Sequence, residues 1–461
     1  MDDKRQKSQK DLASKVQGGG EASTRAMRGS ESFEVMGETE SLAATEYMME
    51  EVLSKENLKE ALSKVMENGG AAGIDGMTVD KLPAYLKDNW KRIRKELKEG
   101  TYAPRAVRRK EIPKVGGVRQ LGIPCAIDRF IQTALQQVFQ RHWDGTFSQH
   151  SYGFRRGKSQ HQAIKQAQEY VCSGLRWVVD FDLEKFFDRV NHDILMSRVA
   201  KRVKDKRVLK LVRAFLNSGI MDNGLVKPTE EGVPQGGPLS PILSNLLLDD
   251  LDKELEKREL RFVRFADDCN VYVASKRAGD RVMASITKFL SKRLRLTVNE
   301  AKSAVDNPWK RKFLGFTFSN QEQPRRQIAP AALQRMKDKI RKLTNRKRGN
   351  SLEQVIEELS SYLRGWIGYF GYCQTPRVLQ KLEGWIRRKL RCLIWKRWKR
   401  GTTRFNRLRA LGMTAHQARG GAGNGAHGPW RMSLSPTLSC ALSVAYFQQR
   451  GLPKLQCFDT A

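Results

Sequence analysis

The sequence has 461 residues and contains no apolar run that approaches the ~18–20 residues needed to span a membrane. Its first five residues, Met1 to Arg5, are mostly charged, unlike the apolar start of a secretory signal. Seven cysteines are scattered along the chain, and no two have the spacing of a zinc knuckle. These absences exclude a disulfide scaffold and predict a cytoplasmic protein with reduced thiols and no membrane partner.

Acidic residues are also in deficit. The chain has 85 Lys and Arg against 50 Asp and Glu, which gives a formal net charge of +35. Solubility alone does not need so large an excess, so the excess favours a polyanionic partner, of which nucleic acid is the commonest. Residues 1–45 are polar and contain one aromatic residue, so we expect a disordered tail there.

Apolar periodicity predicts a mixed arrangement of helices and strands, followed by helices alone. We expect a helix over 47–66, short strands over 101–122, a helix over 128–139, a buried strand over 177–182, a helix over 240–258, two strands over 261–274 and a strand over 313–318. Apolar residues at three- and four-residue steps from Leu352 to Phe370 then predict one face of a long helix. After Gly401 the sequence is basic, then glycine-rich, and irregular to its end.

The candidate chemistry rests on three carboxylates. Asp182 ends an apolar strand, and Asp267 and Asp268 stand at the tip of an expected hairpin. Carboxylates at the ends of adjacent buried strands would converge and repel one another unless a cation neutralised them. Such clusters hold Mg²⁺ for in-line phosphoryl transfer. An Asp-Asp pair between two strands is usually a simple turn, so the pair alone does not establish catalysis.

Further motifs accompany these carboxylates in a fixed order. They are Ile112-Pro113-Lys114 with Arg119 to Pro124, Ser151-Tyr152-Gly153-Phe154-Arg155, Asp182 to Asp188, Gly232 to Pro241, Phe265-Ala266-Asp267-Asp268 and Phe313-Leu314-Gly315-Phe316. Over roughly residues 47–320, this series resembles the fingers and palm motifs of reverse transcriptases, although intron-encoded members more often have Tyr where this chain has Phe265. The resemblance implies an α+β right-hand polymerase, with fingers and palm around an antiparallel sheet and a helical thumb beside it.

The resemblance also implies roles for single residues near the metals. Asp182, Asp267 and Asp268 would be catalytic and would hold two Mg²⁺ ions. Asp268 is the least certain direct ligand of the three. The backbone carbonyl of Phe181 or of Leu183 would be a further ligand.

On the nucleotide side, Lys114 and Arg119 would contact the incoming triphosphate, because cations suit phosphate oxygens. Gln235 would contact the nucleotide or the template. Phe187 would pack under the sugar and exclude a 2′-hydroxyl. The alternatives are ordinary hairpin charge for the two cations, a turn residue for Gln235 and a core aromatic for Phe187.

The last third of the chain resembles the maturase-specific thumb of group II intron proteins, on the segments Ser360 to Phe370 and Leu382 to Arg391. Residues 386–400 contain no acid and eight basic residues, which we expect to bind RNA: Arg387, Arg388, Lys389, Arg391, Lys396, Arg397, Lys399 and Arg400. Trp385, Trp395 and Trp398 interleave with them, which suits phosphate contacts combined with base stacking. The alternative is a core helix with a solvated basic face.

The end of the sequence, around His427 to Ser433, is similar to that of short bacterial intron proteins without a nuclease. His416 and His427 alone do not make a His-rich nuclease site. Gly423 to Gly428 has the spacing of a dinucleotide-binding loop, but no strand precedes it and Pro429 follows where a helix should begin.

The sequence is therefore identified as a member of the group II intron-encoded reverse transcriptase/maturases, in the bacterial short form that lacks an endonuclease domain. We expect fingers and palm over 46–320, a thumb or maturase domain over 321–400 and a basic DNA-binding-like segment over 401–461. The implied partners are intron RNA, an RNA template with a DNA primer, deoxynucleoside triphosphates and target DNA.

Two other readings differ in function. A reverse transcriptase from a retron, a diversity-generating element or a defence element would share the chemistry, but the basic Trp-rich thumb speaks against it. A splicing cofactor with a vestigial polymerase site would share the RNA partner, but the intact Asp182, Asp267 and Asp268 speak against that.

Overall fold

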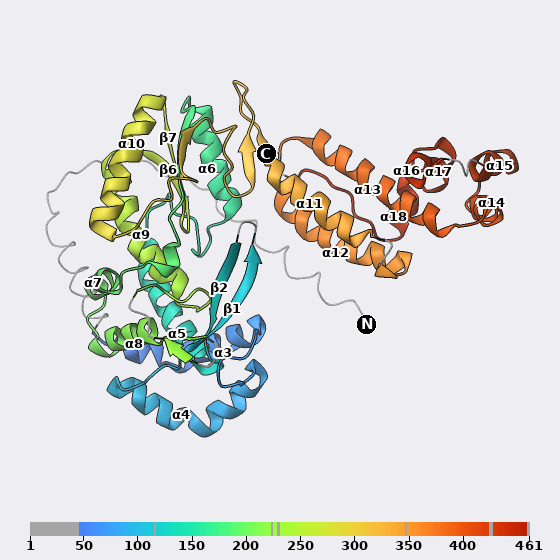
Figure 1. The fold of residues 1–461 in the computed structure, drawn as a ribbon. Helices are drawn as coiled ribbons and strands as arrows, with labels where there is room; N and C mark the ends of the chain where they lie inside the picture. The colour runs from blue at the N-terminus through green and yellow to red at the C-terminus, as the bar shows by residue number, and fades with distance from the viewer. Residues whose placement is uncertain are drawn as a thin grey trace, which may run out of the picture.

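The computed structural model describes residues 46–458, except 115–116, 223–224, 228–230, 346–347 and 424–426. The expected tail, residues 1–45, lies outside the described residues. Figure 1 shows a body of helices and sheets from which a helical arm extends, with the last helices at the far end of the arm. The α+β class and the antiparallel sheet predicted from the sequence are confirmed.

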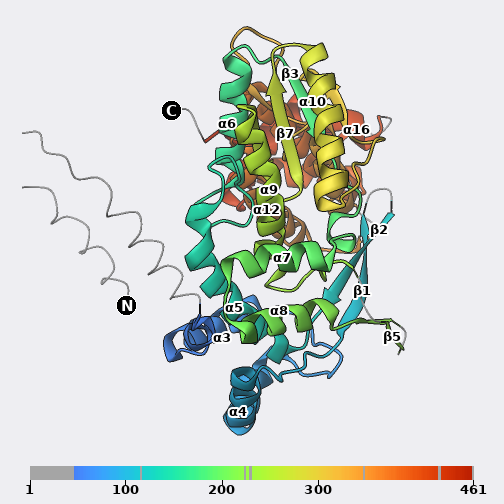
Figure 2. The same cartoon turned by 90° about the vertical axis from the view of Figure 1, so that its left-hand side faces the viewer.

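A four-stranded antiparallel sheet forms the palm, in the strand order β6-β7-β3-β8. Its strands are β3 (Trp177–Phe181), β6 (Arg261–Phe265), β7 (Asp268–Val273) and β8 (Ala304–Asp306). Phe265 lies opposite Asp268, so the turn of the β6–β7 hairpin consists of Ala266 and Asp267. The helices α6 (Gln160–Cys172), α9 (Ser240–Lys257) and α10 (Lys276–Phe289) pack on this sheet (Figure 2).

The palm sheet separates two apolar cores, because side chains alternate between the faces of a strand. Val178 packs in the apolar core that also contains thumb residues, and Val179 packs in the core that also contains fingers residues. By the same alternation, Asp180 and Asp182 lie on the thumb side of the sheet. Asp268 lies there too, two residues before Asn270, which pairs with Asp180 across the strands. The carboxylates therefore face the space beneath the thumb.

The fingers carry a second sheet, in the order β2-β1-β4-β5, and several helices. The elements here are α2 (Met48–Val52), α3 (Lys55–Asn68), α4 (Leu82–Glu99), β1 (Val107–Lys114), β2 (Gly117–Ile123), α5 (Ala126–Trp143), α7 (His192–Arg202), α8 (Lys206–Asn217), β4 (Ile220–Asp222) and β5 (Leu225–Lys227). The single helix expected over 47–66 is broken, because the Ser54 side chain accepts a hydrogen bond from the Asn57 backbone and starts a new helix.

The thumb consists of three helices that follow a two-stranded sheet. These elements are β9 (Phe316–Phe318), β10 (Arg326–Ile328), α11 (Pro330–Leu343), α12 (Leu352–Phe370) and α13 (Pro376–Arg397). The predicted long helix is confirmed as α12. The strand expected over 313–318 is wrong in its first half. Leu314 and Gly315 have φ values of 50° and 80° and form a turn, in which Phe313 and Phe316 exchange backbone hydrogen bonds of 2.9 Å.

The last part of the chain is helical, contrary to the irregular structure expected after its glycine-rich segment. It contains α14 (Gly401–Ala410), α15 (Ala415–Gly423), α16 (Pro429–Met432), α17 (Pro436–Ala441) and α18 (Val444–Gln449). The reason is packing at long range, because Leu408, Leu438 and Phe447 are buried in the core shared with the thumb. No helix in the described part of the chain is both long and apolar enough to cross a membrane.

Candidate active site

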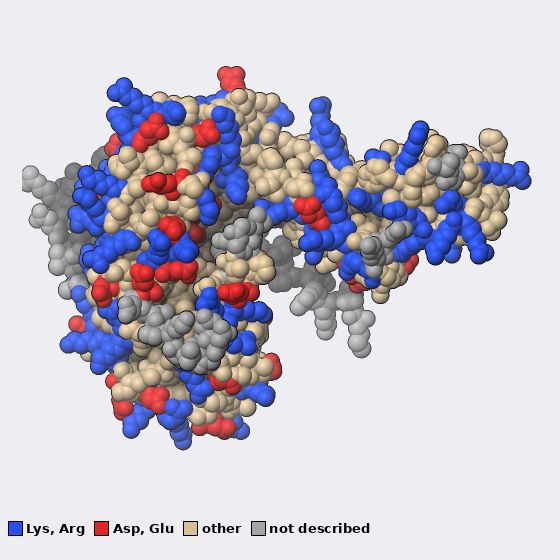
Figure 3. Space-filling model, in the orientation of Figure 1, with Lys and Arg blue, Asp and Glu red and all other residues tan. Residues whose placement is uncertain are grey.

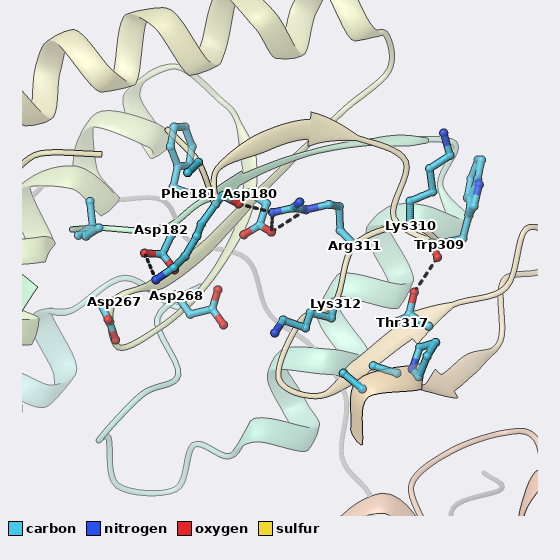
Figure 4. A pocket seen from close by; sticks show the side chains of 16 residues that line it. Asp180, Phe181, Asp182, Asp267, Asp268, Trp309, Lys310, Arg311, Lys312 and Thr317 are labelled. Atoms are coloured by element: carbon cyan, nitrogen blue, oxygen red, sulfur yellow. Dashed lines mark hydrogen bonds and ion pairs between the residues drawn. The ribbon is translucent and has the colours of Figure 1, made fainter. Parts of the chain in front are cut away.

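A cavity of about 780 Å³ lies beside the palm carboxylates, and its far wall is the segment that leads into the thumb. Asp182, Asp267 and Asp268 all line this cavity, so the fold brings together the three residues singled out from the sequence (Figure 4). Phe181 and Leu183 line it as well. A fourth carboxylate, that of Asp180, was missed, although its position two residues before Asp182 in a strand could have revealed it.

Basic side chains from residues 302–312 face these carboxylates. Arg311 donates to one oxygen of Asp180 from Nε at 2.9 Å and from Nη2 at 2.6 Å. The ammonium of Lys302 lies 3.7 Å from Asp182, and Lys312 extends into the same cavity (Figure 4). The cations were not predicted, because their pairing with the carboxylates is visible only in three dimensions.

The carboxylate cluster remains short of positive charge. Burial, and then the charges of Asp180, Asp267 and Asp182, raise the pKa of Asp268 to about 8. Burial also raises the pKa of Asp180, although Arg311 opposes this. Oxygen donors that repel one another are the ligand set that hard divalent cations prefer, so these residues fit a divalent metal.

The predicted metal ligands do not form a closed cage by themselves. Among the described residues, no three His, Cys, Asp or Glu side chains are close enough to hold a metal ion by themselves. The individual ligand assignments, including the carbonyls of Phe181 and Leu183, stay predictions.

A buried ion pair supports the turn that carries Asp267. Arg264 is 0% exposed and donates to both carboxylate oxygens of Asp252, from Nε at 2.7 Å and from Nη2 at 2.5 Å. It also donates to the Ala266 carbonyl at 2.9 Å. Ala266 has a φ of 58°, a strained value for a residue with a Cβ. The Arg264 guanidinium therefore stabilises the strained turn of Ala266 and Asp267.

A smaller cavity, of about 150 Å³, brings Phe187 and Gln235 together beside the β1–β2 hairpin. Phe186 is 2% exposed and belongs to the fingers core, as expected for a core aromatic. Phe187 packs against it edge-on, with ring centroids 5.1 Å apart, and lines the cavity. Of the two rings, therefore, only that of Phe187 is accessible to a nucleotide in this cavity.

Gln235 is fixed to the base of the β1–β2 hairpin, because its carbonyl accepts a hydrogen bond of 2.7 Å from the Gly122 backbone. Lys114 and Arg119 belong to the two strands of this hairpin. Their side chains lie outside the described residues. The nucleotide-binding roles of Lys114, Arg119, Phe187 and Gln235 stay predictions.

The predicted RNA-binding cations fall into two groups. The four at the end of the segment are exposed: Lys396, Arg397, Lys399 and Arg400. The other four are half-buried: Arg387, Arg388, Lys389 and Arg391. Among these, Arg388 and Arg391 donate to the carbonyls of Trp430 and Leu442, so they attach the last helices to α13. Trp395 is 1% exposed and is a core residue rather than a stacking surface. Basic side chains nevertheless gather over the thumb and the last helices on the face drawn in Figure 3.

Carboxylates at the tip of a palm hairpin, beside a helical thumb, define the right-hand polymerase fold. The chain matches the family model described as "Reverse transcriptase (RNA-dependent DNA polymerase)" over residues 108–318. It matches that of the "Group II intron, maturase-specific domain" over residues 333–412. The chain therefore combines a reverse transcriptase region with a group II intron maturase-specific region, which confirms the resemblance identified from the motifs.

Curated relatives agree with this assignment. Protein YkfC of Escherichia coli K12 is 38% identical over 216 residues, which are 45% of this chain and 57% of that protein. The group II intron-encoded protein LtrA of Lactococcus lactis subsp. cremoris is 34% identical over 206 residues, 44% of this chain and 34% of that protein. The matches therefore span 57% or less of these relatives' own length.

Two solved structures resemble the chain weakly. Telomerase from Candida albicans has a TM-score of 0.40 at 14% identity, covering 62% of this chain and 61% of that one. A partial Cas6-RT-Cas1–Cas2 complex has a TM-score of 0.34 at 23% identity, covering 52% and 42%.

Proposed function

We propose that this protein is an RNA-directed DNA polymerase that also binds its group II intron RNA to assist splicing and mobility. The observation that carries the proposal is the gathering of Asp182, Asp267 and Asp268 in one cavity, on the thumb side of the palm sheet. Its substrates would be an RNA template with a DNA primer and deoxynucleoside triphosphates. Target DNA would supply the primer during mobility.

The site's own residues have distinct tasks. Two Mg²⁺ ions, when bound, would activate the primer 3′-hydroxyl and stabilise the leaving pyrophosphate. Asp182 and Asp267 would hold them, with Asp268 and a neighbouring backbone carbonyl completing the ligand set. Because positive charge is in short supply at this cluster, cation binding would lower the raised pKa of Asp268 and relieve the repulsion among the carboxylates.

Nucleotide selection would occur at the smaller cavity. Phe187 would meet the sugar and exclude a 2′-hydroxyl by its shape, while Gln235 would contact the base pair from the rigid turn on which it stands. Lys114 and Arg119, on the hairpin above, would contact the triphosphate. These groups would need to contact the same nucleotide, and the cavity is small enough for the Phe187 ring to decide whether a 2′-hydroxyl fits.

The RNA-binding part of the proposal rests on the exposed cations Lys396, Arg397, Lys399 and Arg400, and on the match to the maturase-specific domain. Phosphate contacts release counterions, so binding of intron RNA should weaken steeply with salt. A salt dependence near zero would contradict an electrostatic grip.

Primer extension on an RNA template with Mg²⁺ and deoxynucleotides tests the polymerase. Wild type should extend, Asp267→Ala should lose extension, and Asp193→Asn should keep it. Asp193 is a suitable control because its side chain is 82% exposed and pairs with Arg213 away from the cavity. A folded wild type that binds intron RNA but extends no primer would instead support a splicing cofactor with a vestigial polymerase site.

A further inference from the structure

Phe154 lines neither of the two cavities described above, and its environment is unusual for phenylalanine. Its side chain is 47% exposed in a body that has two large apolar cores. Its φ of 58° lies in the left-handed region, which costs free energy in any residue with a Cβ. Glycine would adopt this backbone without strain. Packing in the free protein therefore does not account for an aromatic ring at this position.

The segment that carries Phe154 is fixed directly beside the turn of Ala266 and Asp267, which we call the catalytic turn. A Cβ placed on Gly153 would come within 2.2 Å of the Ala266 backbone nitrogen, so the two stretches of backbone are in close contact. The Phe154 ring lies 6.5 Å from the Phe265 ring, at an angle of 42°. Phe265 and Ala266 immediately precede Asp267. An object stacked on Phe154 would therefore lie next to the residues that carry out nucleotide addition.

Phe154 also borders a polar groove of about 740 Å³ between α3, α5 and its own segment. The groove is lined by the amides of Gln136, Gln137 and Gln140 and by the exposed cation Arg156, while the cations Lys64 and Arg141 pair with Glu60 and Glu51. Its two acids are already paired, Glu60 with Lys64 at 2.6 Å and Asp144 with Arg155 at 3.2 Å. An exposed ring beside amides and cations is the combination that binds unpaired nucleotides, because bases stack while phosphates and base edges find polar partners.

We propose that Phe154 is a stacking platform for an unpaired base of the RNA template where the strand approaches the catalytic turn. The neighbouring groove receives the adjoining nucleotides, with Arg156 exposed toward their phosphates. This inference rests on the proposed polymerase function and deepens it, since it assigns the single-stranded part of the template to a defined surface.

Substitution by glycine separates stacking from structure. Phe154→Gly removes the ring and relieves the backbone strain, so its melting temperature should equal or exceed that of wild type. Its affinity for a primed RNA template with an unpaired 5′ overhang should nevertheless fall about tenfold, the scale of one base–aromatic stack. Phe154→Tyr should bind like wild type. A Phe154→Gly variant that loses stability, or that keeps full affinity for the overhang, would overturn the platform.

Two further measurements locate the effect. A blunt primer–template duplex, which has no unpaired template base, should bind wild type and Phe154→Gly equally; an equal loss on both substrates would overturn the assignment. 2-Aminopurine placed at successive overhang positions should be quenched at one of them by wild type and not by Phe154→Gly. Quenching that is the same in both proteins at every position would also overturn it.

Primer extension by the same wild-type preparation keeps the two proposals distinguishable. Extension by wild type together with unchanged overhang binding by Phe154→Gly would refute the platform and leave the polymerase standing. Failure of wild type to bind or extend any primed RNA template would refute the polymerase itself, and the platform with it.

Discussion

Replacing Arg264 by lysine would disturb the turn of Ala266 and Asp267 without changing any of the proposed metal ligands. The Arg264 guanidinium is fully buried and makes its hydrogen bonds to both oxygens of Asp252, to the Ala266 carbonyl, to Asn245 at 3.1 Å and to Ser151 at 2.8 Å. Lysine keeps the charge opposite Asp252, but its single ammonium cannot reach all of these acceptors at once.

The structure sets the size of the effect. At least two buried acceptors would be left without their donor, and each of these costs about 1–3 kcal/mol, so we expect Arg264→Lys to be less stable by about 2–6 kcal/mol. A shift of the Asp267 carboxylate by a fraction of an ångström should lower kcat by about 10–100-fold, because catalysis depends on placement at that scale. The KM for the nucleotide should change little, since Phe187 and Gln235 lie on other elements.

The assay is steady-state primer extension well below the melting temperature, with a Mg²⁺ titration at saturating nucleotide. The Mg²⁺ concentration for half-maximal rate should rise in Arg264→Lys, and Mn²⁺ binding followed by electron paramagnetic resonance should weaken in parallel. Arg202→Lys is the matched control, because Arg202 pairs with the buried Asp249 at 2.7 Å on helices outside the carboxylate cavity. A kcat for Arg264→Lys within twofold of wild type, at equal folded fraction, would refute the reasoning.

Three other substitutions test separate parts of the molecule. Phe187→Ala should gain ribonucleotide incorporation, because the ring that would meet a 2′-hydroxyl is gone; unchanged sugar discrimination in competition assays would contradict the assignment. Burial raises the pKa of Asp128 to about 6 from its ordinary value of 3.8, although Tyr102 opposes this. Between these two values the folded state keeps a proton on Asp128 that the unfolded state has lost. The folded state is therefore favoured at low pH, and this contribution to the free energy of unfolding is lost as pH rises from about 4 to 6. Relative to wild type, Asp128→Asn should gain up to about 3 kcal/mol of unfolding free energy between pH 4 and pH 7, measured by urea titration; a constant difference would argue against the shift. Exchanging four cations together for glutamine should weaken intron RNA binding: Lys396, Arg397, Lys399 and Arg400. The slope of log affinity against log salt concentration should become shallower by roughly one unit for each phosphate that the variant no longer neutralises, while primer extension on a short template persists. An unchanged slope would show that these cations do not contact the RNA.

The parts of the fold that the sequence predicts are those set by local patterns. The apolar run before Asp182 predicts β3 because strand burial needs no distant partner to be recognised. The apolar steps from Leu352 to Phe370 predict α12 for the same reason. The last helices were missed because they are short and α15 contains three glycines, both of which weaken the local helix signal. Burial against the thumb, as at Leu408 and Phe447, stabilises these helices.

The candidate site divides in a similar way. Asp182, Asp267 and Asp268 could be named because family motifs fix their order, and the fold brings them into one cavity. Arg264 and Arg311 could not, since a basic residue in a basic chain gives no sign of which carboxylate it will meet. The turn at Leu314 escaped prediction because a positive φ in a residue other than glycine leaves no local signal.

Backbone strain and buried charge both occur in the motif segments. Four of the six described residues other than glycine with positive φ lie in motif segments: Phe154, Lys185, Ala266 and Leu314. Left-handed backbone and repelling carboxylates both raise the energy of the folded state, so neither persists unless the surroundings hold it in place. Arg264 does so for the Ala266 turn, and Arg311 does so for Asp180. Charge that remains uncompensated at Asp268 is then available to attract cations, and an aromatic ring held outward at Phe154 is available to meet a base. The same features that lower the stability of the free protein are those through which it would recognise metal and template.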